Sequence, residues 1–324
     1  MRRIAKLTVR TVTAIITSCR RGASKLLDPA KGLGGAAVAL LESKRSFRYD
    51  LAVGAIFRDE ADYLEEWLRF HRFVGVQHFY LYDNGSTDRS LEVLGEWIEG
   101  GHVTVVSWPG DAMQRSAYRD CVRRFKNEAR WIAFIDVDEF LFSPRGRDLK
   151  VQLSAYSDLA AIFVYWVLFG SSGHVQKPSG SVIESYDRCL DLETANDRPP
   201  VKPRGATGRV RQGKSIVNPR LVRKYGVHLP DSTWTGITLD ENRRPPAQRV
   251  RESRMTGNVF RINHYWSRSV DELLSKVRRG SVSRGKAAIR IEEDFLAWER
   301  KLNVTQDLTI QKIWADFDQE ETAK

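Results

Sequence analysis

The sequence predicts an α/β fold, with a mostly parallel central sheet flanked by helices and a smaller C-terminal portion. Between residues 50 and 136, short apolar runs alternate with helix-like segments through short connections. Polar clusters follow three of these runs directly, at 58–60, 83–84 and 136–138. Because ligands bind beyond the carboxyl ends of such strands, we expect these clusters to converge on one edge of the sheet.

The first half contains four predicted strands. Each is a short apolar run bounded by turn residues or by acids, as buried strands are. The helix after the first strand is indicated by Leu64, Trp67, Leu68 and His71 at helical spacing. The predicted strands are 51–57, 78–83, 102–108 and 131–136, and the helices between them start near residues 60, 90 and 113.

The second half is less regular. Residues 160–174 predict an aromatic strand that runs into a Gly/Ser turn, and 259–266 predict another strand. A helix is expected from Ser269, a suitable N-cap, to Gly280, and a helical tail is expected over 290–318. Between Val201 and Pro230 there are eight Lys or Arg and no acid, in a segment that begins as an irregular loop.

This organisation suggests three parts: a basic leader at 1–48, a catalytic domain at 49–285 and a helical tail at 286–324. The leader's longest uncharged stretch, Thr11–Cys19, is too short to span a bilayer, and no signal peptide is evident. As a helix it would separate an apolar face from a basic one. Two interpretations stay open: peripheral contact with an anionic membrane surface, or a poorly ordered leader.

The net charge of +11 favours anionic partners but does not choose between nucleic acid, phosphorylated molecules and lipid. The three cysteines are odd in number and have no metal-binding spacing, which favours a reducing compartment. Together with the lack of a membrane-spanning segment, this leads us to expect a cytoplasmic protein, peripheral to the inner membrane face.

The most informative segment is WIAFIDVDEF at 131–140, an apolar strand that ends in acids. Carboxylates are costly to desolvate unless a cation meets them. If the strand continues, Asp136 and Asp138 share a face and offer oxygen ligands to Mg²⁺ or Mn²⁺, ions that commonly bridge to phosphates. The alternative is a solvated acidic turn, since Asp-x-Asp is a common sequence.

Several blocks together resemble a known family. The segments AIFRDEADYLEEWLRFHRFVGVQHFYLYDNGSTD and WIAFIDVDEFLF are similar to the N-terminal half of GT-A glycosyltransferases, and more narrowly to glycosyltransferase family 92 and related bacterial family-2-like proteins. YWVLFGSSGH, KSIVNPRLV and NHYWSRSVDELLSKVRRG resemble later blocks of that family, in the same order over about 50–285. One departure is Asp59, where the family more usually has Asn.

The resemblance implies a nucleotide-sugar donor, usually a UDP-sugar, and a Mn²⁺ or Mg²⁺ ion that stabilises the leaving diphosphate. It implies an acceptor that is a glycan or a lipid-linked intermediate, bound on the side of the smaller C-terminal portion. Trp166 is a candidate to stack on the acceptor sugar, although core packing is the alternative. The candidate metal ligands are Asp136, Asp138 and His264, with His228 as a competitor, and the candidate donor-binding residues are Asp59, Glu60, Asp83, Lys214 and Arg220.

Family 92 resemblance also implies inversion at the anomeric carbon, which requires a general base on the acceptor hydroxyl. The sequence does not single this base out. The candidates are Glu184, Asp231, Asp271 and Glu139, the last of which lies closest to the metal.

Three other functions were weighed. A nucleotidyltransferase should carry a Gly-rich basic loop after its first strand, whereas FRDEAD is acidic and lacks glycine. A nucleic-acid-binding protein should interleave aromatic and basic residues, but most aromatics here lie in apolar runs, so no nucleic-acid partner is expected. A glycoside hydrolase would use paired carboxylates without a metal or a nucleotide.

Overall fold

The computed structural model describes residues 45–197, 212–246, 254–279 and 292–322, with single positions at 34, 35, 37, 40 and 42. The leader predicted at 1–48 therefore lies almost wholly outside the described residues. Within the described ranges, no helix combines the length and apolar character needed to cross a membrane.

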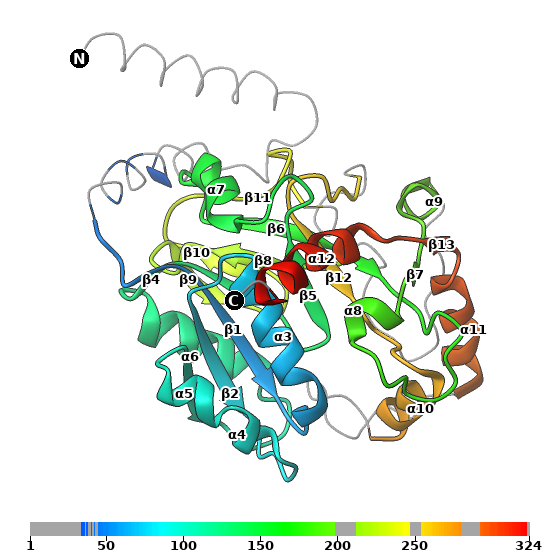
Figure 1. Ribbon diagram of the computed structural model, residues 1–324. Coiled ribbons are helices and arrows are strands. Elements are labelled where there is room, and N and C mark those ends of the chain that lie inside the picture. The colour runs from blue at the N-terminus through cyan, green and yellow to red at the C-terminus, as the bar shows by residue number, and fades with distance from the viewer. Residues whose placement is uncertain are drawn as a thin grey trace.

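The first half forms the predicted parallel sheet (Figure 1). Its four strands pair in the order β3-β2-β1-β4, all parallel, and the helices between them cover the sheet. The strands are β1 (Tyr49–Phe57), β2 (His78–Asp83), β3 (Val103–Ser107) and β4 (Ala129–Phe134). The helices are α3 (Ala61–Phe73), α4 (Ser90–Val93), α5 (Gly95–Glu99) and α6 (Gln114–Phe125).

Strand β1 shows why this half could be predicted from local pattern. It is buried on both faces, and its alternate residues enter two separate cores, one containing Val53 and the other Ala52. Gly54 is required by close packing, because a Cβ there would lie 2.7 Å from the ring of Phe134. A run that is apolar on both faces is typical of a central parallel strand.

The second half extends this into a nine-stranded mixed sheet with the order β3-β2-β1-β4-β8-β6-β12-β5, and β11 paired with β6. Strand β8 runs antiparallel to both neighbours, β12 runs parallel to β6, and β5 runs antiparallel to β12. The strands are β5 (Glu139–Phe142), β6 (Ala161–Leu168), β8 (Gly213–Val217), β11 (Thr238–Asp240) and β12 (Arg261–His264). Most strand pairings are thus parallel, and the GT-A-like architecture expected from the sequence is confirmed.

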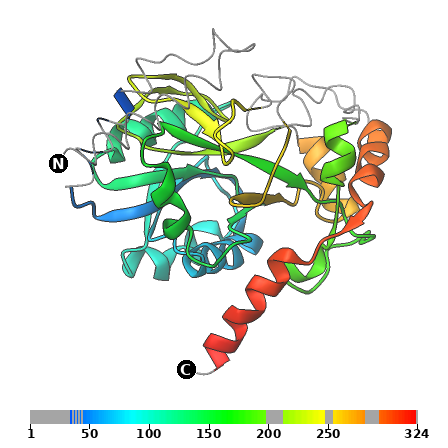
Figure 2. The ribbon, with the colours of Figure 1, turned by 90° about the horizontal axis from the view of Figure 1, so that it is seen from above.

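Smaller elements complete the chain. The predicted tail is two helices separated by a short strand, and its Trp298 and Trp314 belong to the main core. In Figure 2, α12 leads to the C-terminus at the edge of the molecule. The two small sheets are β9 (Val222–Tyr225) with β10 (Pro230–Thr233), and β7 (Arg188–Cys189) with β13 (Thr305–Gln306). The remaining helices are α7 (Leu149–Leu153), a 3₁₀ turn (Ser154–Tyr156), α8 (Val182–Ser185), α9 (Leu192–Asp197), α10 (Val270–Arg279), α11 (Glu292–Leu302) and α12 (Thr309–Thr322).

Candidate active site at the carboxyl edge of the sheet

The acids of WIAFIDVDEF lie in a tight turn between β4 and β5. The strand ends at Phe134, two residues before the predicted end, and β5 begins at Glu139. The amide of Glu139 donates to the carbonyl of Asp136 (3.0 Å), and its carboxylate accepts from the Asp136 amide (3.1 Å). The condition under which both aspartates would share one face, a strand that continues through them, is therefore not met. The chain has to reverse here because β5 pairs with β12, and the two aspartates meet different partners.

Asp136 is held by three side chains. Lys214 of β8 donates from Nζ at 2.8 Å, and Gln114 and Tyr118 of α6 donate at 2.7 and 2.8 Å. Lys214 is almost fully buried. Burial by itself would lower the pKa of its ammonium group, but the negative charges of Asp136 and Glu139 outweigh burial and raise it. Lys214 is therefore a permanent cation at the carboxyl edge.

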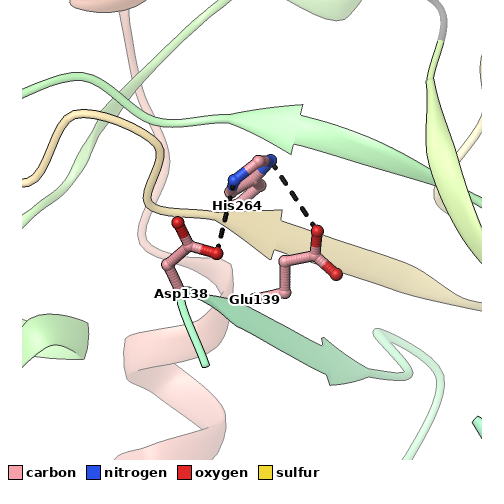
Figure 3. A group of neighbouring side chains, drawn as sticks. All are labelled: Asp138, Glu139 and His264. Atoms are coloured by element: carbon pink, nitrogen blue, oxygen red, sulfur yellow. Dashed lines mark ion pairs between the residues drawn. The ribbon is translucent and has the colours of Figure 1, made fainter. Parts of the chain in front are cut away.

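Asp138, Glu139 and His264 form a separate cluster (Figure 3). Each offers one ligand atom, and these atoms lie within 4.8 Å of one another. His264 Nε2 is 3.5 Å from Asp138 Oδ1, and His264 Nδ1 is 4.0 Å from Glu139 Oε1. The antiparallel pairing of β12 with β5 sets His264 opposite Glu139, which explains how residues 125 positions apart meet.

The electrostatics of this cluster suit a cation. Burial raises the pKa of Glu139 well above its ordinary value, against the pull of Lys214. Burial lowers the pKa of His264 despite the nearby Asp138, so its ring is neutral at pH 7, the form that binds metals. Within the described chain, Glu139 Oε1 and His264 Nδ1 are buried and accept or donate no hydrogen bond. One divalent cation would satisfy both atoms, so the residues present fit a metal ion.

Asp138 also binds a lysine. Lys276 of α10 places Nζ 2.6 Å from Asp138 Oδ2. Burial opposes ionisation of Asp138, yet the adjacent cationic groups, Lys276 first among them, hold its pKa well below the usual range. Because His264 is neutral at pH 7, Lys276 is the principal counter-charge there.

Glu60 and Arg268 form the next layer of the site. Arg268 Nη1 lies 3.2 Å from Glu60 Oε2, and its guanidinium carbon lies 3.4 Å from the centre of the Tyr63 ring. Burial raises the pKa of Glu60, while the charge of Arg268 opposes this. Arg268 and Asp59 both have positive φ, +52° and +54°. Such conformations in residues other than glycine are strained and concentrate at functional sites.

Asp59 and Asp83 shape the turn after β2. Asp83 accepts from the amide of Ser86 (2.9 Å), and Asp59 accepts from the amide of Thr87 (2.7 Å). Together they hold residues 84–88 against the start of α3, beside the carboxyl ends of β1 and β2. Their expected contacts with a donor nucleotide stay predictions.

The other predicted residues lie apart from this cluster. Arg220 binds Glu42 and the carbonyls of Lys126, Ala129 and Arg130, at the opposite end of β4 from the acids. Glu184 caps α8 with Ser181, Asp231 pairs with Arg119 at 3.1 Å, and Asp271 lies exposed in the first turn of α10. None of the three joins the acidic cluster.

Trp166 lies between the two histidines weighed as ligands, its ring centre 4.5 Å from that of His264 and 5.3 Å from that of His228. His228 bonds through Nδ1 to the carbonyl of Gly213 (3.0 Å) and is not in the acidic cluster. Trp166 is almost fully buried, as the core-packing alternative predicts.

Four residues of the site were missed by sequence reasoning: Gln114, Tyr118, Arg268 and Lys276. The one available signal was on α10, where Ser269, Glu272 and Lys276 fall at helical spacing on one face. For Gln114 and Tyr118 no local signal existed, because their role depends on how α6 packs beside β4.

The fold and this site have the features expected of the GT-A glycosyltransferase class. The glycosyltransferase family 92 model matches residues 52–320, and the chain belongs to this family. A family 92 protein from Ricinus communis is 35% identical over 44% of this chain and 27% of its own length. A galactan β-1,4-galactosyltransferase from Arabidopsis thaliana is 26% identical over 56% of this chain and 35% of its own length. The chain thus spans about a third or less of these curated relatives.

Among solved structures, the crystal structure of S. aureus TarS 1–349 in complex with UDP is similar, with a TM-score of 0.36 and 13% identity. The likeness covers 56% of this chain and 52% of that one. The family assignment rests on the family match.

Proposed function

We propose that this chain is a metal-dependent glycosyltransferase that moves a sugar from a nucleotide-sugar donor, a UDP-sugar by preference, to a glycan or lipid-linked acceptor with inversion. The observation that carries the proposal is the cluster of Asp138, Glu139 and His264. Two of its buried atoms have no hydrogen-bond partner in the described chain and face one another across 4.0 Å.

The ion, when bound by these three residues, supplies Lewis-acid stabilisation to the diphosphate leaving group. The chain's own cations add to this stabilisation. Lys214 is buried and charged, and Arg268 is fixed by Glu60 and Tyr63, so both can hold negative charge without reorganising.

Burial sets the chemical roles at the acids. The raised pKa of Glu139 would suit a general base, but its buried oxygen faces His264 and Lys214. A carboxylate that binds the metal cannot also take the acceptor proton. In this proposal Glu139 is therefore a metal ligand and not the base, and Glu184, Asp231 and Asp271 stay sequence predictions for that role. The cytoplasmic location also stays a prediction from the sequence.

The proposal is tested by thermal shift and calorimetry with UDP, GDP and UDP-sugars in Mn²⁺, Mg²⁺ or EDTA. Ligands that bind the native state raise the melting temperature. We expect a metal-dependent rise with one nucleotide that is lost in Asp138→Asn and His264→Ala. Glu184→Gln is the matched control, because Glu184 lies in α8 outside the cluster.

Reaction products then separate the alternatives. Release of a nucleoside diphosphate supports the proposal if NMR also shows that the transferred sugar has the inverted anomeric configuration in the product. Release of pyrophosphate from a nucleoside triphosphate supplied together with a sugar 1-phosphate would indicate a nucleotidyltransferase. No nucleotide binding by folded protein would refute both functions.

A further inference from the structure

A basic pocket of about 580 Å³ lies between α6 and the β9–β10 hairpin, away from the acidic cluster. Six of its lining residues are Lys or Arg and one is acidic. Three of the cations already have partners: Arg119 pairs with Asp231, Arg123 with Asp120, and Arg220 with Glu42. Lys126, Arg223 and Lys224 remain, all exposed and without an acidic partner in the described part of the chain.

Trp234 completes this face. It follows β10, and 67% of it is exposed, the only aromatic among the exposed large apolar residues of the described ranges. The guanidinium of Arg223 lies 5.3 Å from its ring centre. An exposed indole beside a cation is typical of an interfacial position, because Trp is favoured where one side is apolar and the other is wet.

The leader meets the folded chain at the same place. A Cβ on Gly34 would touch the side chain of Thr235, and one on Gly35 would lie 3.0 Å from Gly236 Cα. Both contacts are with residues that directly follow Trp234. The preceding segment, 1–33, carries eight Lys or Arg and a single acid. Gly34 and Gly35, which directly follow this basic segment in the sequence, thus lie beside the turn after Trp234.

We propose that the face of Lys126, Arg223, Lys224 and Trp234, which we call the basic face, binds the surface of a membrane rich in anionic phospholipid. Lys and Arg are attracted to such a surface by about 1 kcal/mol each, and the indole enters the interface. This inference does not depend on the proposed enzymatic activity. It assigns membrane contact to the folded domain rather than to the leader alone.

The basic face and the acidic cluster can function together. Gln114 at the start of α6 donates to Asp136, whereas Lys126 directly follows the end of the helix. The length of α6 therefore separates them by roughly 18 Å, since a helix rises 1.5 Å per residue. A domain docked by this face would keep the site clear of the lipid surface.

The test is co-sedimentation of the full chain with phosphatidylcholine vesicles, with or without phosphatidylglycerol, over a range of salt concentrations. The leader's net charge is removed by replacing Arg2, Arg3, Lys6, Arg10, Arg20, Arg21 and Lys25 with Gln in one protein, which leaves only Lys31 and Asp28 charged in residues 1–33. We expect this protein to retain salt-sensitive binding to the anionic vesicles only. Adding Lys126→Gln, Arg223→Gln and Lys224→Gln should weaken the remaining binding by roughly a hundredfold, about fivefold per charge.

Trp234→Ala in the same background should weaken binding at high salt, where the charges are screened. The matched control is Arg300→Gln, Lys301→Gln and Lys312→Gln, three exposed cations of α11 and α12, and it should bind as the parent does. Melting temperature and nucleotide binding should not change in any of these proteins.

Three outcomes would overturn the inference. The leader-neutral protein fails to sediment, the basic-face variants sediment like their parent, or the α11–α12 control loses as much binding as they do. A fourth outcome would also overturn it. If the parent protein binds a soluble acidic polysaccharide but no vesicles, and the basic-face variants lose that binding, the ligand is an acidic glycan.

Discussion

Lys276 Nζ lies 2.6 Å from Asp138 Oδ2, so a lysine of α10 contacts the carboxylate best placed to bind a metal. The other aspartate of the turn has the same kind of partner, since Lys214 contacts Asp136. The cation that meets the acids of WIAFIDVDEF is thus, in the protein alone, an ammonium group. The two lysines differ in burial, since Lys214 is enclosed and the side chain of Lys276 is 37% exposed.

The Lys276–Asp138 pair predicts competition between lysine and metal. In Lys276→Met, Mn²⁺ should bind roughly fivefold more tightly, because a partly exposed ion pair of about 1 kcal/mol no longer has to break. Calorimetry with Mn²⁺ measures this. Lys150→Met, at another partly exposed lysine paired to an aspartate, should leave the affinity unchanged. Weaker binding in Lys276→Met would mean that Lys276 assists the metal.

The turn between β4 and β5 predicts unequal roles for the two aspartates. Asp138→Asn should reduce Mn²⁺ affinity by roughly a hundredfold or more, because Asp138 belongs to the candidate metal-binding cluster. Asp136→Asn should reduce it less, because Lys214, Gln114 and Tyr118 already bind Asp136. Equal losses, measured by the same calorimetry, would support the sequence expectation that both aspartates are ligands.

The burial of Lys214 predicts a stability effect. Lys214→Met leaves Asp136 and Glu139 without their counter-charge and should lower the free energy of unfolding by about 2–4 kcal/mol, somewhat less than for a fully buried pair. Urea denaturation measures the loss. Adding Asp136→Asn should restore part of it, since the stranded charge is then removed. A double variant no more stable than the single one would argue against this account.

Arg220 predicts a separation of stability from donor binding. It binds Glu42 and three carbonyls at the end of β4 that is distant from the acids. Arg220→Lys should lower the melting temperature, because lysine cannot satisfy this fork of acceptors, and leave nucleotide affinity unchanged. A selective loss of nucleotide binding would instead restore Arg220 to the donor site.

His71 predicts a pH dependence of stability. It is fully buried. Its Nδ1–H donates to the carbonyl of Trp67 (2.7 Å), and its Nε2 accepts from the amide of Leu141 (3.1 Å). Burial lowers its pKa to about 3, so the unfolded chain binds its proton first as pH falls. Stability from the neutral ring is complete above about pH 6.5 and is lost between there and pH 3, by up to about 1.4 kcal/mol per pH unit.

His71→Phe should flatten the pH dependence of the unfolding free energy between pH 6.5 and 4.5, even though the variant is less stable at neutral pH. Urea denaturation at a series of pH values compares the two slopes. Parallel slopes would show that the His71 ring becomes protonated in the folded protein.

The parallel half of the sheet was predictable because each strand carries its own signal. The run HFYLYD was expected at 78–83 and is β2 over those residues, with every position buried. The acids after WIAF were also expected to meet a cation, from the cost of desolvating carboxylates, and in the structure lysine ammonium groups contact Asp136 and Asp138. In this half the local composition and the observed burial agree, so residues near in sequence were sufficient to predict the strands.

Strands β5 and β8 were not predicted. The sequence analysis therefore could not place Glu139 opposite His264, or Lys214 beside Asp136. Glu139–Phe142 is only four residues long and directly follows the acids, so it reads as a continuation of β4. Lys214 was named from its basic surroundings, but its burial between β4 and β6 could not be inferred from them.

The sequence by itself determined that acids end a buried strand at the carboxyl edge of an α/β sheet, and that the chain belongs with nucleotide-sugar-dependent families by resemblance. Only the tertiary structure decided that Glu139 faces His264 while Asp136 turns to Lys214. The physical reason is that a strand's own pattern depends on neighbouring residues, whereas strand pairing depends on contacts between residues far apart in the chain, which local periodicity does not record.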